Sequence, residues 1–341
     1  MTNRSSKLYR AFALPFALGL AAAACGSDSA GTSAGSDDTS TSEGAAETGG
    51  AAFADLDLSG VELTVGSKDF TEQLVLGEML VQSFEAAGAT VDNKVDLGGT
   101  VVNREALLSG EIDTYAEYNG TGWTVHLEKD YADVTEADGT VDPAKLTAAV
   151  AEADLAENNV VWLGQSPFND TYGFASSPDL LDDGKPFTMD TMAAYLEANA
   201  DAKLCLESEF PVRPDGLVLF EQGTGYTVPE SQIEILDTGI IYTETRDGNC
   251  DFGEVFTTDG RIGGLGLNLV EDPGMMIVYN VSITMLDDVY QQNPAAFDAI
   301  AEQLFAPLDA ATMTELNRRV DIDGETPADV ANSFLTEQGL I

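Results

Sequence analysis

The sequence predicts an α/β protein built from two lobes, and two observations lead to this prediction. The chain has 341 residues, which is enough for a large core and is more typical of two lobes than of one. From residue 61 onward, short β-rich runs alternate with amphipathic helical stretches. That alternation is typical of mostly parallel sheets flanked by helices.

The predicted elements follow one another in a regular order. The first strand is VELTVG, and the first helix is DFTEQLVLGEMLVQSFEAAG, whose apolar residues recur at helical spacing and which ends at Gly88. Further strands are predicted at TVDNKVDL, IDTYAEY, VVWLG, KLCLE, IEIL and CDFGEVF, and further helices at VVNREALLSG, TMAAYLEANA and TGIIYTETRDG. A strand around MMIVYNVSITM and helices near residues 294–305, 312–320 and 326–338 come last. They predict a chain that crosses back to complete the first lobe.

The N-terminus has the features of an export signal. Basic residues precede the apolar run AFALPFALGLAAAA, which is too short for a stable membrane-spanning helix. Small residues directly before Cys25 resemble a bacterial lipoprotein cleavage site, so residues 1–24 are predicted to be removed and Cys25 to carry the lipid. A plain secretory signal is the alternative. Residues 25–54 are predicted to be a flexible tether, because almost nothing in the stretch 26–50 could be buried.

The mature chain is strongly acidic. The signal segment holds three of the 15 basic residues and no acidic one, so 12 basic residues remain against 59 acidic ones, a formal charge of −47. Such a balance argues against nucleic acid and anionic lipid as partners. It suits a protein that must stay soluble in high salt, or one whose ligand is a cation.

The chain lacks the residue patterns of a metal site and of the common enzyme motifs. Its only histidine is His126, and neither Cys205 nor Cys250 has a second ligand at metal spacing. No nucleophile elbow, phosphate-binding loop or dinucleotide fingerprint is present. We therefore expect no metal and no cofactor, and binding without catalysis is the favoured class. Because Cys205 and Cys250 lie in the exported part, a disulfide between them is predicted, with two free buried thiols as the alternative.

One spacing of residues occurs twice in the chain. Each copy places a glycine at the end of a helix, followed by an aspartate, an aromatic residue and a polar residue: Gly110, Asp113, Tyr118 and Thr121 in the first copy, Gly248, Asp251, Phe256 and Asp259 in the second. Each aromatic residue then lies at the carboxyl end of a predicted strand, where open α/β sheets bind ligands. If each lobe holds one copy, the two aromatic residues face each other across a cleft.

Aromatic rings at such a cleft favour a particular ligand chemistry. Ring faces carry negative charge density and attract a methylated ammonium group, which has no hydrogen to donate. Tyr118, in AEYNGTGW, is predicted to be one wall of such a box, with ordinary core packing as the alternative. Lys68 lies between a predicted strand and helix, where free N–H groups and the helix dipole favour an anion such as a carboxylate. Thr121 is predicted to cap the next helix in the same topological position.

These stretches resemble the substrate-binding proteins of ABC transporters for osmoprotectants, the glycine betaine, carnitine and choline group. GSKDFTEQLVLGEML is similar to that family's opening strand and helix, and LLSGEIDTYAEYNGTG is similar to its next signature. The resemblance runs from about Val61 to the C-terminus. It implies ligand-binding positions in four later motifs: Tyr172 in FNDTYGFA, Arg213 in RPDG, Phe256 in EVFTTDGRI and Tyr279 in EDPGMMIVYN.

The resemblance also implies a fold and a mode of action. The fold would be the type II periplasmic-binding-protein-like fold, with lobe 1 at residues 61–165 plus 275–341, lobe 2 at residues 166–274, and two hinge crossings. The ammonium group would lie among Tyr118, Tyr172, Phe256 and Tyr279, and a carboxylate would meet Lys68, Thr121 and Arg213.

We expect a monomer, lipid-anchored to the outer face of the bacterial cell membrane, that delivers its ligand to an ABC permease and catalyses nothing. Two alternatives stay open: a binding protein for an amino acid or a polyamine, and an exported hydrolase with a pair of acidic residues.

Overall fold

The computed structural model describes residues 51–137 and 139–341. The predicted signal peptide, Cys25 and most of the predicted tether lie outside these residues. The described chain begins with a short 3-10 helix, Ala52–Asp55, in which Phe53 is fully buried. The backbone N–H groups of Ala52 and Phe53 donate to the carbonyls of Gly339 and Leu340 near the C-terminus. Residues 52–54, which were predicted to belong to the tether, are therefore part of the folded chain, because an apolar ring and backbone hydrogen bonds hold them there.

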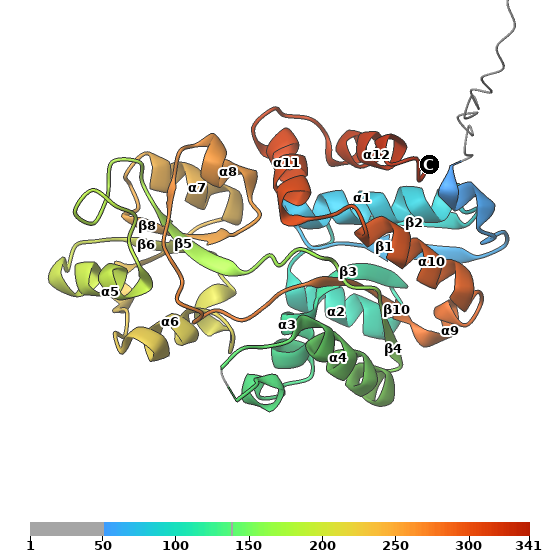
Figure 1. Cartoon of the computed structure of the whole chain (residues 1–341), viewed down its shortest axis with the longest axis horizontal. Helices are drawn as coiled ribbons and strands as arrows, with labels where there is room; N and C mark the ends of the chain where they lie inside the picture. Colours follow the sequence, from blue (N-terminus) through green and yellow to red (C-terminus); the bar gives the residue numbers. More distant parts are fainter. Residues whose placement is uncertain (1–50, 138) are drawn as a thin grey trace, which may run out of the picture. The chain divides into compact units, whose positions relative to one another are not determined.

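Two separate sheets organise the described chain (Figure 1). The first sheet has the spatial order β2 (Thr90–Lys94), β1 (Glu62–Gly66), β3 (Thr114–Tyr118), β10 (Val281–Leu286) and β4 (Val160–Leu163). The second has the order β7 (Ile233–Ile235), β6 (Leu204–Leu206), β8 (Phe252–Phe256), β5 (Tyr172–Ser176) and β9 (Asn268–Leu269). We call the first sheet with its helices the first lobe, and the second sheet with its helices the second lobe.

Each sheet contains one strand that runs against the others. Within the described residues, β10 pairs antiparallel with both β3 and β4, and β5 pairs antiparallel with both β8 and β9. The remaining pairings, β1 with β2 and β3 and β6 with β7 and β8, are parallel. The sheets are therefore mostly parallel, as predicted, and each is made mixed by one reversed strand. The cause is the connectivity, since β5 and β10 are the strands with which the chain enters one lobe from the other.

Helices cover both faces of the first sheet. Its helices are α1 (Thr71–Ala86), α2 (Thr100–Ser109), the short α3 (Asn119–Thr121), α4 (Pro143–Asn158), α9 (Asp287–Tyr290), α10 (Pro294–Phe305), α11 (Ala310–Asp321) and α12 (Pro327–Glu337). One core joins buried residues of α1, α10, α11 and α12 to the sheet, and a second core joins α2 and α4 to Tyr115 and Trp162. The C-terminal helices thus complete the first lobe, as the sequence predicted.

The second lobe is smaller. Its helices are α5 (Met189–Ala198), α6 (Leu217–Thr224), α7 (Thr238–Arg246) and α8 (Gly260–Gly264). Buried residues of α5 and α6 pack with Phe174 and Phe252 of the sheet, while Tyr242 of α7 lies in a separate cluster on Ala175 and Val255. Two crossing segments, residues 164–171 and 270–280, connect the lobes.

The repeated spacing occupies equivalent places in the two lobes. Asp113 accepts a hydrogen bond from the backbone of Thr64 at 2.6 Å, and Asp251 accepts one from the backbone of Lys203 at 2.8 Å. The preceding glycines, Gly110 and Gly248, have φ of 72° and 74°, a conformation that L side chains rarely adopt. Each aspartate therefore ties the start of its strand to the neighbouring strand, β1 in one lobe and β6 in the other.

Within residues 51–137 and 139–341, no helix combines the length and apolar character needed to cross a membrane.

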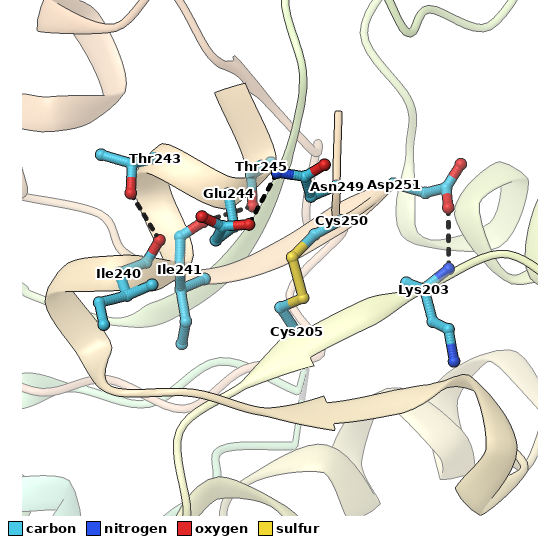
Figure 2. Close-up of a disulfide and its surroundings, with 10 residues drawn as sticks. All are labelled: Lys203, Cys205, Ile240, Ile241, Thr243, Glu244, Thr245, Asn249, Cys250 and Asp251. Carbon is cyan, nitrogen blue, oxygen red and sulfur yellow. Dashed lines mark hydrogen bonds between the residues drawn. A yellow bond between two sulfur atoms is a disulfide. The ribbon is translucent and has the colours of Figure 1, made fainter. Parts of the chain in front are cut away.

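Cys205 and Cys250 form a disulfide in the second lobe (Figure 2). Cys205 lies in β6 and Cys250 lies in the turn between α7 and β8. Both cysteines are buried beside Ile241. The bond therefore joins α7 and β8 to β6 at the point where Asp251 also holds the two strands together.

Replacing both cysteines with alanine should destabilise the second lobe. The bond closes a loop with a sequence separation of 45 residues, and the chain entropy that it removes from the unfolded state corresponds to about 4 kcal/mol. Urea unfolding of C205A/C250A and of the oxidised wild type measures the loss. A free energy of unfolding that is equal in the two proteins would contradict this account.

Candidate ligand-binding site

Five aromatic rings form a closed circuit of contacts between the two lobes. In order around the circuit, ring centroids lie 6.2 Å apart for Tyr118 and Phe70, 4.8 Å for Phe70 and Phe256, 5.2 Å for Phe256 and Tyr172, 5.4 Å for Tyr172 and Tyr279, and 6.4 Å for Tyr279 and Tyr118. Phe70 is nearly parallel to Tyr118 and Phe256, while Tyr279 is nearly perpendicular to Tyr118 and Tyr172. The rings thus present both faces and edges to the same region.

The two sheets and their crossings place these rings. Tyr118 is the last residue of β3, and Phe70 is the residue before α1. Tyr172, the first residue of β5, pairs directly with Phe256, the last residue of β8. Tyr279 lies in the second crossing segment, just before β10. The first lobe therefore contributes Tyr118 and Phe70, the second lobe contributes Tyr172 and Phe256 from the ends of adjacent strands, and the crossing adds Tyr279.

All five rings line one cavity of about 630 Å³. Lys68 and Thr121 line it as well, with Gly99, Thr100 and residues 235–240. Its lining also includes five carboxyl side chains, namely Asp69, Asp170, Glu207, Glu209 and Asp237. The cavity is therefore aromatic and acidic.

A buried carboxylate, Glu72, lies behind the rings. Its oxygens accept hydrogen bonds from the hydroxyl of Tyr118 at 2.9 Å, the hydroxyl of Thr258 at 2.5 Å and the amide of Asn317 at 3.2 Å. Asp170 forms a further side-chain hydrogen bond to it. Two carboxyl groups share a hydrogen bond only through a proton, so this pair holds at least one proton.

Burial determines the protonation of this pair. It raises the pKa of Glu72, against the hydrogen bonds of Thr258, Tyr118 and Asn317, which lower it. Burial, together with the nearby charge of Glu72, raises the pKa of Asp170 well above its ordinary value. The charge of Asp259 acts on Asp170 in the same direction, while hydrogen bonds from Thr258 oppose it. Asp170 is therefore the neutral member of the pair.

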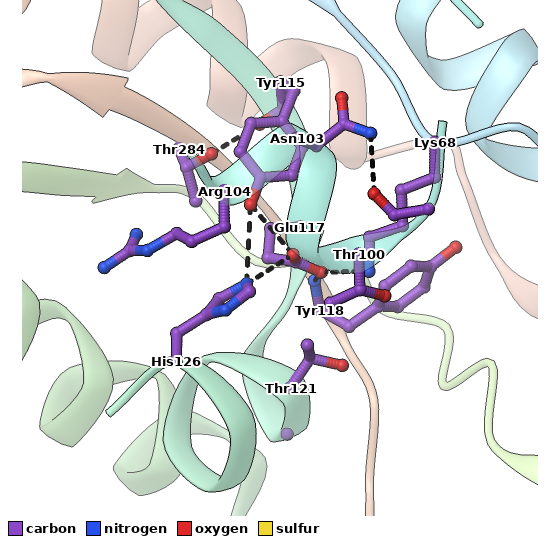
Figure 3. A network of polar contacts seen from close by, with 12 residues as sticks. Lys68, Thr100, Asn103, Arg104, Tyr115, Glu117, Tyr118, Thr121, His126 and Thr284 are labelled. Carbon is purple, nitrogen blue, oxygen red and sulfur yellow. Dashed lines mark hydrogen bonds and ion pairs between the residues drawn. The ribbon is translucent and has the colours of Figure 1, made fainter. Parts of the chain in front are cut away.

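A second buried carboxylate, Glu117, has a lowered pKa, whereas that of Glu72 is raised (Figure 3). It accepts from Lys68 Nζ at 2.7 Å, His126 Nε2 at 2.8 Å and the hydroxyl of Tyr115 at 2.9 Å. Burial alone would raise the pKa of Glu117, but the charge of Lys68 and the bond to His126 outweigh it and hold the pKa far below the ordinary value. Burial lowers the pKa of His126, so the imidazole is neutral. Glu117 and Lys68 thus form a buried ion pair, with the Lys68 nitrogen 5.1 Å from the centre of the Tyr118 ring.

Arg213 lies against the cavity from the second lobe, with its donors already engaged. Its guanidinium donates to both carboxylate oxygens of Asp215 at 2.9 Å, to the hydroxyls of Thr100 and Thr121 at 3.2 Å, and to Glu209 at 3.5 Å. The guanidinium carbon is 5.5 Å from the centre of the Tyr172 ring. In the described chain Arg213 is not part of the cavity lining. It contacts groups that line the cavity and connects the two lobes.

Most of the predicted site residues come together in this structure. Tyr118, Tyr172, Phe256, Tyr279, Lys68 and Thr121 all line the cavity. Sequence reasoning missed Phe70, although it lies two residues after Lys68 in the motif GSKDF. It also missed Glu72 and Asp170, which carry no signal of their own among 59 acidic residues.

The chain is similar to known proteins over most of its length. A family model described as the substrate binding domain of ABC-type glycine betaine transport systems matches residues 61–337. This chain belongs to that family. The glycine betaine-binding protein YehZ of Escherichia coli (strain K12) is 30% identical to it over 281 residues, 81% of this chain and 90% of YehZ. A glycine-betaine-binding protein of Pseudomonas aeruginosa is 30% identical over 286 residues, 82% of this chain and 88% of the relative.

A solved structure agrees with this assignment. The ligand-free structure of YehZ from Escherichia coli has a TM-score of 0.60 at 28% identity, covering 82% of this chain and 99% of YehZ. The type II periplasmic-binding-protein-like fold and the family resemblance that the sequence predicted are confirmed. Members of this family are substrate-binding components of transporters, which act outside the cytoplasm.

The Asp170→Asn variant should be less sensitive to pH than the wild type. The raised pKa of Asp170 means that the native state holds a proton that the unfolded chain releases above about pH 4. The free energy of unfolding of the wild type therefore falls as the pH rises from about 4 through the pKa of the folded protein, by up to ~1.4 kcal/mol per pH unit. The asparagine keeps a hydrogen-bond donor and does not titrate. The free energy of unfolding of D170N should therefore increase relative to that of the wild type as the pH rises.

Urea unfolding of both proteins between about pH 5 and about pH 8 measures this difference. Parallel pH profiles for the two proteins would show that Asp170 is ionised in the folded state.

Proposed function

We propose that this chain is the extracytoplasmic binding component of an ABC importer for quaternary ammonium osmoprotectants, such as glycine betaine, carnitine and choline. The observation that carries the proposal is the closed circuit of aromatic rings on one cavity between the lobes. A quaternary ammonium group has no hydrogen to donate and binds best where ring faces surround it. The similarity to proteins named for glycine betaine binding supports the same class of ligand.

In this proposal the ammonium group lies among Tyr118, Tyr172, Phe256, Tyr279 and Phe70. Each ring contributes about 0.5–2 kcal/mol, so four rings at the upper end of that range give about 8 kcal/mol, which corresponds to micromolar affinity. Lobe 1, at residues 61–165 plus 275–341, and lobe 2, at residues 166–274, close around the ligand by bending at the two crossings. The closed, loaded form then docks on the permease in the membrane. The protein acts as a monomer and catalyses nothing.

The ring of Tyr172 offers the sharpest test of this cage. In the described chain its hydroxyl has no hydrogen-bond partner, so Tyr172→Phe keeps every contact of the ring. Tyr172→Leu keeps apolar volume but loses the ring face. We expect Y172L to bind glycine betaine or choline at least about tenfold more weakly than the wild type, and Y172F to bind about as tightly as the wild type.

Isothermal titration calorimetry on the three proteins measures these affinities. Equal binding by Y172L and the wild type would remove this ring from the site. Proline and a polyamine serve as comparison ligands, because a protein that binds either of them more tightly than any quaternary amine has a different solute.

The proposed lipid anchor has its own test. If Cys25 carries a lipid, the protein expressed with its own signal segment in a bacterium should be recovered in the membrane fraction, and Cys25→Ser should release it in soluble form. Fractionation followed by immunoblotting measures the distribution. Equal membrane association of the wild type and C25S would show that Cys25 is not the anchor.

A further inference from the structure

The two cations beside the cavity and the N-terminus of α2 already hold carboxyl groups of the protein. A zwitterionic osmoprotectant carries a carboxylate at the end opposite its ammonium group, and a binding site for it needs uncompensated donors or positive charge. The strongest candidates here are Arg213, Lys68 and the N-terminus of α2. The helix α7 also begins at the cavity, but its N-cap residue is the acidic Asp237.

The two cations are neutralised inside the protein. Arg213 uses its five N–H groups on Asp215, Thr100, Thr121 and Glu209, and it is only 6% exposed. Lys68 is paired with Glu117, whose depressed pKa keeps it ionised, and their side chains are 4% and 0% exposed. Neither residue therefore brings an unbalanced positive charge to the ligand.

The N-terminus of α2 is occupied by Glu209 from the other lobe. The backbone N–H of Thr100, the first residue of α2, donates to Glu209 Oε1 at 3.0 Å. Gly99 makes this approach possible, since a Cβ at that position would collide with the same oxygen. The helix dipole and the free N–H groups, which favour an anion at a helix start, are thus already used by a carboxylate of the protein.

The other lining groups add negative charge. Asp69 lines the cavity two residues before the start of α1. Asp237 is exposed at the opposite wall, and Glu207 lies beside Glu209. A ligand carboxylate placed here would meet like charges at short range in a partly buried cavity, where such repulsion is screened less than in water.

We propose that this site selects a net cation, a quaternary ammonium compound whose far end carries a hydroxyl or another uncharged polar group, over a zwitterion with a carboxylate. The inference rests on the proposed function, because it assigns the part of the ligand that the aromatic cage does not bind. Glu209 is the discriminating residue. It occupies the N-terminus of α2, so that a ligand carboxylate cannot bind there, and it offers an acceptor to a ligand hydroxyl.

Calorimetric titration of the wild-type protein with choline and with glycine betaine tests the inference. We expect choline to bind at least about tenfold more tightly. Glycine betaine binding that is as tight as choline binding, or tighter, overturns the proposal. If the protein binds neither ligand nor any other quaternary amine, the proposed function itself fails, which is a different result from binding with the opposite preference.

The Glu209→Ala variant tests whether Glu209 causes the preference for choline over glycine betaine. Removal of the side chain leaves the Thr100 N–H without its acceptor and takes one negative charge away from the cavity. The ratio of choline affinity to glycine betaine affinity should therefore fall by about tenfold. The ratio is the readout because Glu209 also connects the lobes, and any change in the cost of closure affects both ligands equally. A ratio equal to that of the wild type overturns the role of Glu209.

A matched control separates this local effect from the general charge of the protein. Glu302 is an exposed carboxylate on α10 and does not line the cavity. Glu302→Ala changes the net charge of the protein by the same amount as E209A and should leave the affinity ratio at its wild-type value. If E302A lowers the ratio as much as E209A does, the preference arises from net charge, and the proposed role of Glu209 is wrong.

Discussion

The buried carboxylate of Glu72 is the interaction on which the site depends. A carboxylate that is 3% exposed costs several kcal/mol unless its oxygens are filled by donors. The donors that fill them come from α11, β3, the segment after β8 and the first crossing, through Asn317, Tyr118, Thr258 and Asp170. Elements far apart in sequence therefore converge on one point because one group requires them there.

The cage follows from this convergence. Tyr118 is bonded to Glu72 directly, and Phe70 lies two residues before Glu72 on the same chain segment. Phe256 lies two residues before Thr258, and Tyr172 lies two residues after Asp170. The carbonyl of Tyr279 accepts the backbone N–H of Asp170 at 3.2 Å. Each ring of the circuit thus lies within two residues of Glu72, of Asp170 or of a group that is hydrogen-bonded to one of them. This arrangement positions all five rings, although not every ring makes a hydrogen bond itself.

The fold could be predicted from the sequence because its periodic elements are long and strongly patterned. The predicted helix at residues 294–305 coincides with α10, and the repeated spacing marked the two strands, β3 and β8, that carry Tyr118 and Phe256. The helix α4 was not predicted, although Asp142 caps it and Pro143 begins it, which are recognised start signals. The strand predicted around residues 275–285 begins only at Val281, because the residues before it form the crossing between the lobes.

The site could be predicted only in part, since contacts between lobes leave no local pattern. The motif RPDG identified Arg213, but the bonds that engage its guanidinium come from Asp215 two residues on and from Thr100 and Thr121 in the other lobe. Likewise, Glu72 reads as an ordinary acidic residue in the first turn of a helix. Its partners Thr258 and Asn317 are 186 and 245 residues away in sequence. Only the folded structure shows which of many carboxyl groups is surrounded by donors.

The saturation of Glu72 and the proton on Asp170 bear on which cations the cage accepts. A primary ammonium group must replace the hydrogen bonds that it made to water, and it needs acceptors to do so. The oxygens of Glu72 are already filled, and neutral Asp170 presents no charge to the cavity. A fully alkylated ammonium group has no such requirement and loses little when water leaves, while the ring faces attract its charge. The buried carboxylate that positions the rings therefore offers no free acceptor of its own to a primary ammonium group held among them.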